Sequence, residues 1–233
     1  MNIRKLIYIC LCIIIFNIIS CCYCLNNEEE EALNYLKLKK EGIYGIEDYE
    51  KNVYKGLGFY KSKINDNDLK IISKLINIEE LAINEKSITD EGIKFLKDLK
   101  KLKKLSLPNT FLTDAGMEYI GQLANLEKLD ISQTKVTDEG LKYLQGLKKL
   151  RELSLMYNKI TDKGIEYIKD LPLEVLYLTG TQVSDKSVPL LEKMTTLEEL
   201  VIDKTKITPQ GAKRLEDKLS AIVRYSDEDF SRE

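Results

Sequence analysis

Histidine and tryptophan are absent from this sequence, and all five cysteines lie within its first 24 residues. Without histidine the chain has no Ser-His-Asp triad, no Cys-His nucleophile pair and no imidazole ligand for zinc. Because no cysteine follows residue 24, the rest of the chain has no thiolate nucleophile, no disulfide and no cysteine metal ligand. These absences exclude most hydrolase mechanisms, and we expect a non-enzymatic protein with no catalytic residues, no cofactor and no metal centre.

Charges of the two signs nearly balance. The chain has 36 lysines and arginines against 38 aspartates and glutamates, which gives a formal net charge of −2. Nucleic-acid-binding domains carry a clustered basic excess, so we expect no nucleic-acid partner. With 43% hydrophobic residues the sequence is too apolar for a disordered chain. We expect a folded, monomeric protein.

The N-terminal segment has the layout of a secretory signal peptide. Arg4 and Lys5 precede an apolar run from Leu6 to Ile19, and small residues follow. We expect residues 1–20 to be removed and the folded part of the chain to be exported.

The residues Ile18-Ile19-Ser20-Cys21 resemble a bacterial lipobox, in which the cysteine is acylated and becomes the first mature residue. Acylation of Cys21 would anchor the protein to a membrane of the cell envelope or at the cell surface. Two alternatives stay open. One is an uncleaved membrane anchor that runs to about Leu25, near the ~20 residues that span a bilayer. The other is a plain cleaved signal that leaves the protein secreted.

From residue 54 to residue 220 the sequence repeats with a period of 24 residues. One unit, LEKLDISQTKVTDEGLKYLQGLKK, starts at Leu126. It is flanked by LKKLSLPNTFLTDAGMEYIGQLAN from Leu102 and by LRELSLMYNKITDKGIEYIKDLP from Leu150. Seven such units follow one another with almost no insertion, which is typical of a solenoid.

Each unit predicts one strand and one helix. In the unit from Leu126 the first half alternates apolar and polar residues, as a strand with one buried face does. The second half places leucines three residues apart, on one face of a helix. The apolar positions are Leu126, Leu129 and Ile131 in the strand half, and Leu141, Leu144 and Leu147 in the helix half.

A Thr-Asp-x-Gly motif recurs between the two halves of most units. Thr137 stands where its hydroxyl can cap the helix, Asp138 where the helix dipole favours a carboxylate, and Gly140 where the neighbouring turn comes close. A catalytic acid would not be exchangeable for proline, as in Thr208-Pro209. Each carboxylate is expected to serve its own helix, so we expect no specific calcium site on the stacked acidic residues. These are Asp66, Asp90, Asp114, Asp138, Asp162 and Asp185.

The two ends of the repeat array predict covering elements. After a tether at residues 21–27, residues 28–53 should form a helical cap and a first strand, with Asn27 as the helix cap and the strand at 42–48. Acidic Glu28–Glu31 at the start of the helix and lysines near its end suit the helix dipole. Beyond the seven units, residues 221–233 predict a final strand over 221–226 and a polar tail.

Over residues 54–220 the repeats resemble those of bacterial leucine-rich repeat proteins, with the pattern L-x-x-L-x-L-x-x-T-x-[IV]-T-D-x-G-L-x-x-L. The resemblance implies an α/β fold: a leucine-rich repeat solenoid, or horseshoe, with parallel strands on the concave face, helices on the convex face and a helical N-terminal cap. It also implies protein–protein recognition through the concave sheet, with no known reaction. The pattern is related to that of F-box substrate adaptors, but this chain has no F-box segment and lacks the repeat cysteine, so we expect no ubiquitin-ligase role.

Alternate strand residues should point to the concave face. In the central units this set is polar or mixed: Lys104, Ser106, Pro108, Lys128, Asp130, Ser132, Glu152, Ser154 and Met156. Further along, the expected exposed set becomes apolar and aromatic: Met156, Tyr157, Val175, Tyr177 and Val201. Because tyrosine is enriched where partners are anchored, we predict that these five residues bind a protein partner. The alternative is that they only satisfy strand propensity on an uncommitted face.

Two function classes follow from these observations. The first is an exported, lipid-anchored interaction module, and the second is a structural envelope lipoprotein without a discrete ligand. An enzyme is disfavoured because the repeat spreads tyrosines and carboxylates along the chain and places no base beside a nucleophile.

Overall fold

The computed structural model describes residues 25–39, 42–50 and 55–225. The predicted signal peptide, Cys21 and the polar tail over residues 227–233 lie outside the described residues, as does residue 226 at the end of the predicted final strand. Within the described ranges, no helix combines the length and apolar character needed to cross a membrane.

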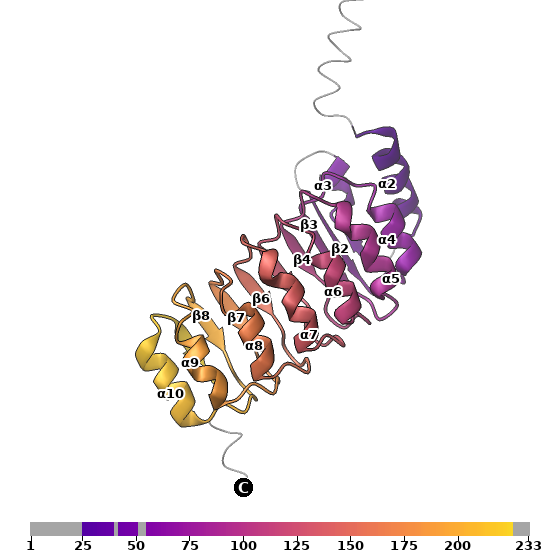
Figure 1. Ribbon diagram of the computed structural model, residues 1–233. Coiled ribbons are helices and arrows are strands. Elements are labelled where there is room, and N and C mark those ends of the chain that lie inside the picture. Colours follow the sequence, from indigo (N-terminus) through magenta and orange to yellow (C-terminus); the bar gives the residue numbers. More distant parts are fainter. Residues whose placement is uncertain (1–24, 40–41, 51–54, 226–233) are drawn as a thin grey trace, which may run out of the picture.

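One sheet runs the length of the described chain, and its nine strands follow their order in the sequence (Figure 1). Strand β1 pairs antiparallel with β2, and every later neighbour pairs parallel. The strands are β1 Ile43–Tyr44, β2 Gly56–Tyr60, β3 Glu80–Asn84, β4 Lys104–Ser106, β5 Lys128–Asp130, β6 Glu152–Ser154, β7 Val175–Tyr177, β8 Glu199–Val201 and β9 Ile222–Arg224.

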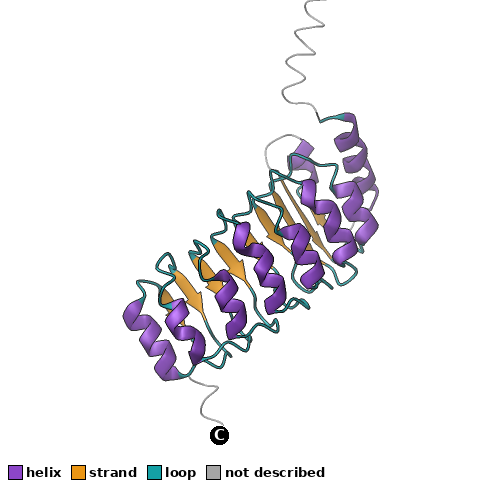
Figure 2. Cartoon of the chain, viewed as in Figure 1, coloured by secondary structure: helices purple, strands orange, loops and turns teal. Residues whose placement is uncertain are grey.

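Helices form a second layer over one face of the sheet and leave the other face open (Figure 2). They are α2 Asn27–Lys39, α3 Ile46–Glu50, α4 Asp66–Ile72, α5 Asp90–Ile93, α6 Asp114–Ile120, α7 Asp138–Leu141, α8 Asp162–Ile168, α9 Val188–Leu191 and α10 Pro209–Lys218. Short 3₁₀ helices extend or precede three of them: η1 Lys94–Asp98, η2 Lys142–Gly146 and η3 Asp185–Ser187. The repeated strand–helix solenoid expected from the sequence is confirmed.

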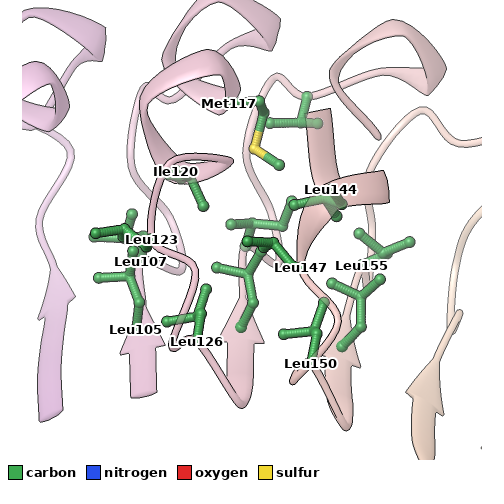
Figure 3. Close-up of a cluster of buried hydrophobic side chains, with 14 of the residues drawn as sticks. Leu105, Leu107, Met117, Ile120, Leu123, Leu126, Leu144, Leu147, Leu150 and Leu155 are labelled. Carbon is green, nitrogen blue, oxygen red and sulfur yellow. The ribbon is translucent and has the colours of Figure 1, made fainter. Parts of the chain in front are cut away.

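Leucines from consecutive units stack into one core between the two layers (Figure 3). Leu129 lies in register with Leu105 of the preceding strand and Leu153 of the next, and all three are buried. The six apolar positions predicted for the unit from Leu126 are likewise buried. Burying one leucine contributes about 1.5–3 kcal/mol, so each unit is held mainly by the leucines of its neighbours.

The N-terminal cap starts one residue earlier than predicted. Asn26, not Asn27, caps α2, because its side chain accepts the backbone N–H of Glu29 (2.8 Å) and its own N–H donates to the Glu29 carboxylate (3.2 Å). Glu29 is buried and also accepts hydrogen bonds from the Tyr49 hydroxyl (2.9 Å) and the Asn77 amide (3.0 Å). This buried carboxylate therefore ties α2 to α3 and to the first repeat.

The first strand is shorter than expected. A strand was predicted over residues 42–48, but β1 has two residues and Ile46–Glu50 form helix α3. Gly45 ends the strand with φ at +87°, and a Cβ there would lie 2.2 Å from the carbonyl oxygen of Gly56. The close approach of β1 to β2 at Gly45 thus turns the chain out of the sheet.

The aspartate of each Thr-Asp-x-Gly motif bonds to the next unit instead of its own helix. The Asp138 carboxylate accepts the backbone N–H of Thr161 (2.8 Å) and its hydroxyl (2.6 Å). The same pair of bonds joins Asp66 to Thr89, Asp90 to Thr113, Asp114 to Thr137, Asp162 to Ser184 and Asp185 to Thr208. We call these six contacts the Asp–cap ladder. The expectation that each carboxylate serves its own helix is wrong.

The threonine caps its own helix in most units, as expected, but Thr137 does not. Thr113 and Thr161 accept a backbone N–H from their own helix, two residues further on. Thr137 has the extended backbone of a cap but makes no such side-chain bond. Its hydroxyl donates to Asp114 alone, at 2.6 Å.

The motif glycine makes room for the carboxylate of the preceding unit. A Cβ on Gly140 would lie 2.6 Å from Asp114 Oδ1, and one on Gly164 would lie 2.5 Å from Asp138 Oδ1. Ser187 replaces this glycine in one unit, and its hydroxyl bonds to Asp162 Oδ1 (2.6 Å). Burial alone would raise the pKa of Asp162, but the hydrogen bonds from Ser187 and Ser184 hold it below its ordinary value.

Two of the departures from the motif lie at the two ends of the ladder. In the first unit Asp68 stands at the glycine position, where it accepts bonds from the Asn65 backbone N–H, the Tyr35 hydroxyl and the Lys39 ammonium group. In the last unit Pro209 stands at the aspartate position, where no further Thr-Asp-x-Gly unit follows. Each ladder aspartate bonds to the cap of the next unit. The first unit therefore needs no glycine to make room for a preceding aspartate, and the last unit needs no aspartate.

Asp138→Ala should destabilise the protein by about 1–3 kcal/mol, because it leaves a part-buried N–H and hydroxyl of Thr161 without their acceptor. Urea denaturation of both forms measures the difference in free energy of unfolding. The matched control is Glu139→Ala, which removes the adjacent carboxylate and its exposed ion pair with Lys163 and should leave the midpoint close to that of the wild type. Equal effects of the two substitutions would contradict this account.

Candidate functional site

The open face of the sheet corresponds to the predicted concave face. Parallel pairing places corresponding residues of successive units side by side across the strands. One row across this face contains Glu80, Lys104, Lys128, Glu152, Val175, Glu199 and Ile222. The next row contains Ala82, Ser106, Asp130, Ser154, Tyr177, Val201 and Arg224.

Polar side chains dominate the middle of the open face. Asp130 accepts hydrogen bonds from the hydroxyls of Ser106 (3.2 Å) and Ser132 (2.5 Å), and Ser132 bonds to Ser154 (2.7 Å). These bonds connect β4, β5 and β6 through their side chains. Among the residues that the structure describes, no three His, Cys, Asp or Glu side chains gather as ligands for a metal ion.

Four of the five predicted partner-binding residues are accessible on this face or at its edge. Met156, Val175 and Tyr177 are half-buried, and Tyr157 is 49% exposed. Val201 is only 8% exposed, so the expectation that it belongs to the exposed set is wrong. It lies between Tyr177 on β7 and Arg224 on β9, and a short side chain in that position is covered by longer neighbours.

Tyr157 lies beyond the strand, in the turn that leaves the sheet. Its φ of 57° is in the left-handed region, which tyrosine seldom adopts. Its N–H donates to the carbonyl of Thr179, and a Cβ on Gly180 would lie 2.4 Å from the Tyr157 ring. The ring therefore packs over Gly180. The four accessible residues extend from β7 to the turn at the edge of the open face.

Tyr177 lies among paired charges. Glu152 pairs with Lys128 at 2.5 Å, and Glu199 pairs with Arg224 at 2.9 Å. Burial and the two nearby carboxylates raise the pKa of Tyr177 above its ordinary value. The phenol is consequently neutral at physiological pH, and it presents an aromatic ring with one hydroxyl donor.

A hollow of about 470 Å³ on the other half of the open face was missed by the sequence analysis. Gly58, Ala82 and Tyr44 line it together with charged side chains of β3 to β6, among them Lys104 and Lys128. The signal was present in the sequence, because Gly56-Leu57-Gly58 places glycines at row positions where most later units carry larger side chains. Only the structure shows that Tyr44 of β1 closes one side.

Comparison with known proteins shows which folds this chain resembles. The leucine rich repeat family model matches residues 100–160, and no curated protein matches the chain. The crystal structure of internalin C2 from Listeria monocytogenes is similar at 18% identity and a TM-score of 0.50, over 74% of this chain and 80% of that one. The structure of the Leptospira interrogans LRR protein LIC12759 is 23% identical over 66% of this chain and 45% of that one, with a TM-score of 0.47.

The family match lies within the repeats, and internalin C2 has the same fold over most of its length. Together with the 24-residue frame and the parallel sheet that it builds, these findings show that the chain has the leucine-rich repeat solenoid fold.

Proposed function

We propose that this protein is an interaction module that binds a protein partner through the open face of its sheet. The observation that carries the proposal is the cluster of Met156, Tyr157, Val175 and Tyr177, which follows the polar middle of the open face. Tyrosine side chains offer a large contact area and lose little conformational freedom on binding, which is why interfaces are enriched in them.

The paired charges around this cluster support the same reading. Interfaces commonly have an apolar centre and a polar rim. Here the ion pairs Lys128–Glu152 and Glu199–Arg224 flank Tyr177 without imposing a large net charge. A partner with one or two apolar anchors and polar groups around them would match this surface.

We further propose that the chain is exported and anchored through an acylated Cys21, with residues 1–20 as the signal peptide and a short tether between Cys21 and the Asn26 cap of α2. The support comes from the sequence alone: the Arg4-Lys5 start, the apolar run and the Ile18–Cys21 motif. The main alternative is a structural envelope lipoprotein without a discrete ligand. Affinity capture from the native envelope separates the two, because a single stoichiometric partner supports the module and none supports the structural role.

Tyr157→Lys combined with Tyr177→Lys should weaken binding of the captured partner by roughly 100- to 1000-fold, because buried aromatic anchors each contribute about 2 kcal/mol or more. Lysine is tolerated by the left-handed backbone at residue 157, since Lys204 holds the corresponding turn position with φ at 52°. Titration calorimetry with the purified partner measures the change, and a melting curve checks the fold.

Tyr60→Lys is the matched control, because Tyr60 is also 49% exposed but lies at the end of β2, in another part of the sheet. It should bind the partner as the wild type does. A folded double variant with wild-type affinity would exclude the cluster and point to the helical face instead.

Growth with an alkyne-bearing fatty acid should label the wild-type protein at Cys21, and Cys21→Ser should abolish the label. Cys22→Ser is the control, and it should leave the labelling unchanged. Mass spectrometry of the N-terminal peptide locates the modification. An unlabelled wild-type protein whose mature N-terminus begins elsewhere would refute the lipid anchor while leaving the interface proposal standing.

A further inference from the structure

The sheet ends differently at its two edges. At the N-terminal edge, strand β1 has only two residues, and Gly45 then turns the chain out of the sheet. Short edge strands of this kind limit pairing with other chains. At the C-terminal end, where α10 lies in Figure 1, β9 has three residues, as β4 to β8 have, and within the described residues its one neighbour in the sheet is β8. The C-terminal edge is therefore the one that can accept another strand.

The backbone of β9 has hydrogen-bonding groups on its outer side. The Ile222 N–H donates to the Glu198 carbonyl (2.8 Å), and the Arg224 carbonyl accepts the Ile202 N–H (2.9 Å). Both residues thus bond toward one side of β9, the side of β8. Because successive residues of a strand direct their backbone groups to opposite sides, Val223 directs its N–H and carbonyl away from β8. A further strand could bond to both groups.

The side chains of this edge do not discourage such pairing. Natural edge strands are commonly protected by proline, by lysine or by a charge that points inward, and residues 221–225 contain no proline, lysine or acidic residue. Arg224 is the one charged residue among them, and its charge is paired with Glu199 on β8 (2.9 Å). Ile222 is 62% exposed on the open face. An apolar edge of this kind favours pairing with another chain.

The apolar core also ends at β9 without full cover. Val223 is in register with Leu200 of β8 and Leu176 of β7, which are buried, but Val223 itself is only half-buried. Tyr225 packs against the same core and is half-buried as well. A lone peptide strand would bring no helical layer to cover these side chains. A second copy of this chain would bring a strand with the same alternation together with its own α10.

We propose that the chain forms a two-fold symmetric dimer in which β9 pairs antiparallel with β9 of a second copy. Val223 lies on the two-fold axis and exchanges both of its backbone hydrogen bonds with Val223 of the second copy. The axis is perpendicular to the sheet, so the two sheets become one and the helices of both copies stay on the same side. This differs from the monomer expected from the sequence, because the open edge is evident only in the folded chain.

Charges across this junction are complementary. With Val223 on the axis, Ile222 of one copy faces Arg224 of the other, and Glu199 lies beside the same Ile222 on β8 of its own copy. An acidic and a basic side chain therefore flank each Ile222, and the aliphatic stem of the arginine packs against it. The junction uses neither the tyrosine cluster nor Cys21, so the dimer goes beyond the function proposed above and does not depend on it.

Sedimentation equilibrium of the purified full chain, in a detergent matched to the density of the solvent, measures the protein mass. The wild type should show a concentration-dependent equilibrium between one and two chains. Ile222→Lys should weaken dimerisation by about tenfold or more, because the lysine faces Arg224 of the second copy, while Glu199 accommodates it within its own copy. Tyr44→Lys is the matched control, since Tyr44 is also 62% exposed but lies on the opposite edge of the sheet, and it should dimerise as the wild type does.

Two further variants test the register of the junction. Val223→Pro removes an N–H that points away from β8, so it should leave the bonds to β8 in place and still weaken dimerisation. Adding Arg224→Glu to Ile222→Lys should restore dimerisation at least in part, because each new lysine then faces a new glutamate of the second copy. A melting curve of each variant verifies that it is folded.

The proposal is overturned if the wild type stays monomeric up to its highest soluble concentration, or if folded Ile222→Lys and Val223→Pro dimerise as the wild type does. Assemblies larger than a dimer would also overturn it, because a two-fold interface closes after two copies. If the wild type is monomeric and deletion of residues 227–233 releases a dimer, the edge is assigned to the chain's own tail instead.

Discussion

The interaction on which the rest of this structure depends is the bond from each motif aspartate to the helix cap of the next unit. A solenoid unit cannot bury its own apolar face, so the fold is only as stable as the contacts between neighbours. The leucine stack supplies apolar burial but little direction, because leucines of similar size pack in several ways. The Asp–cap ladder adds a directed polar contact, repeated six times, that holds each helix start one strand spacing from the last.

That regularity allows the open face of the sheet to vary. Residues that hold the units together point inward or lie at the helix starts, while the rows on the open face carry lysine, glutamate, aspartate, tyrosine or nothing beyond a glycine. The tyrosine cluster near β7 and the hollow near β2 are two such variations on one frame. The repeat neither requires nor forbids either of them, so a function for this protein has to be argued from such positions and not from the fold.

The repeat could be predicted from the sequence because its period and its apolar alternation are local signals. The frame that placed Leu129 in a strand core and Leu144 in a helix core is confirmed by their burial. The direction of the aspartate bonds could not be predicted. An aspartate directly follows the capping residue in every unit except the last. A bond within the unit and a bond to the next unit therefore leave the same sequence pattern, and only the departures at the two ends, Asp68 and Pro209, carried the difference. Val201 was misplaced because alternation fixes the side of a strand but not how much the neighbouring side chains cover it, and the hollow needed the pairing of β1 with β2.

The central claim is that Asp138 and Thr161 are coupled across the unit boundary, and a double-mutant cycle tests it most directly. The free energies of unfolding of Asp138→Ala, Thr161→Ala and the double variant would be compared with that of the wild type. The ladder predicts a coupling energy above about 0.5 kcal/mol, whereas the corresponding cycle between Asp138 and the distant Thr208 should be additive. Additive effects of Asp138→Ala and Thr161→Ala would contradict the account.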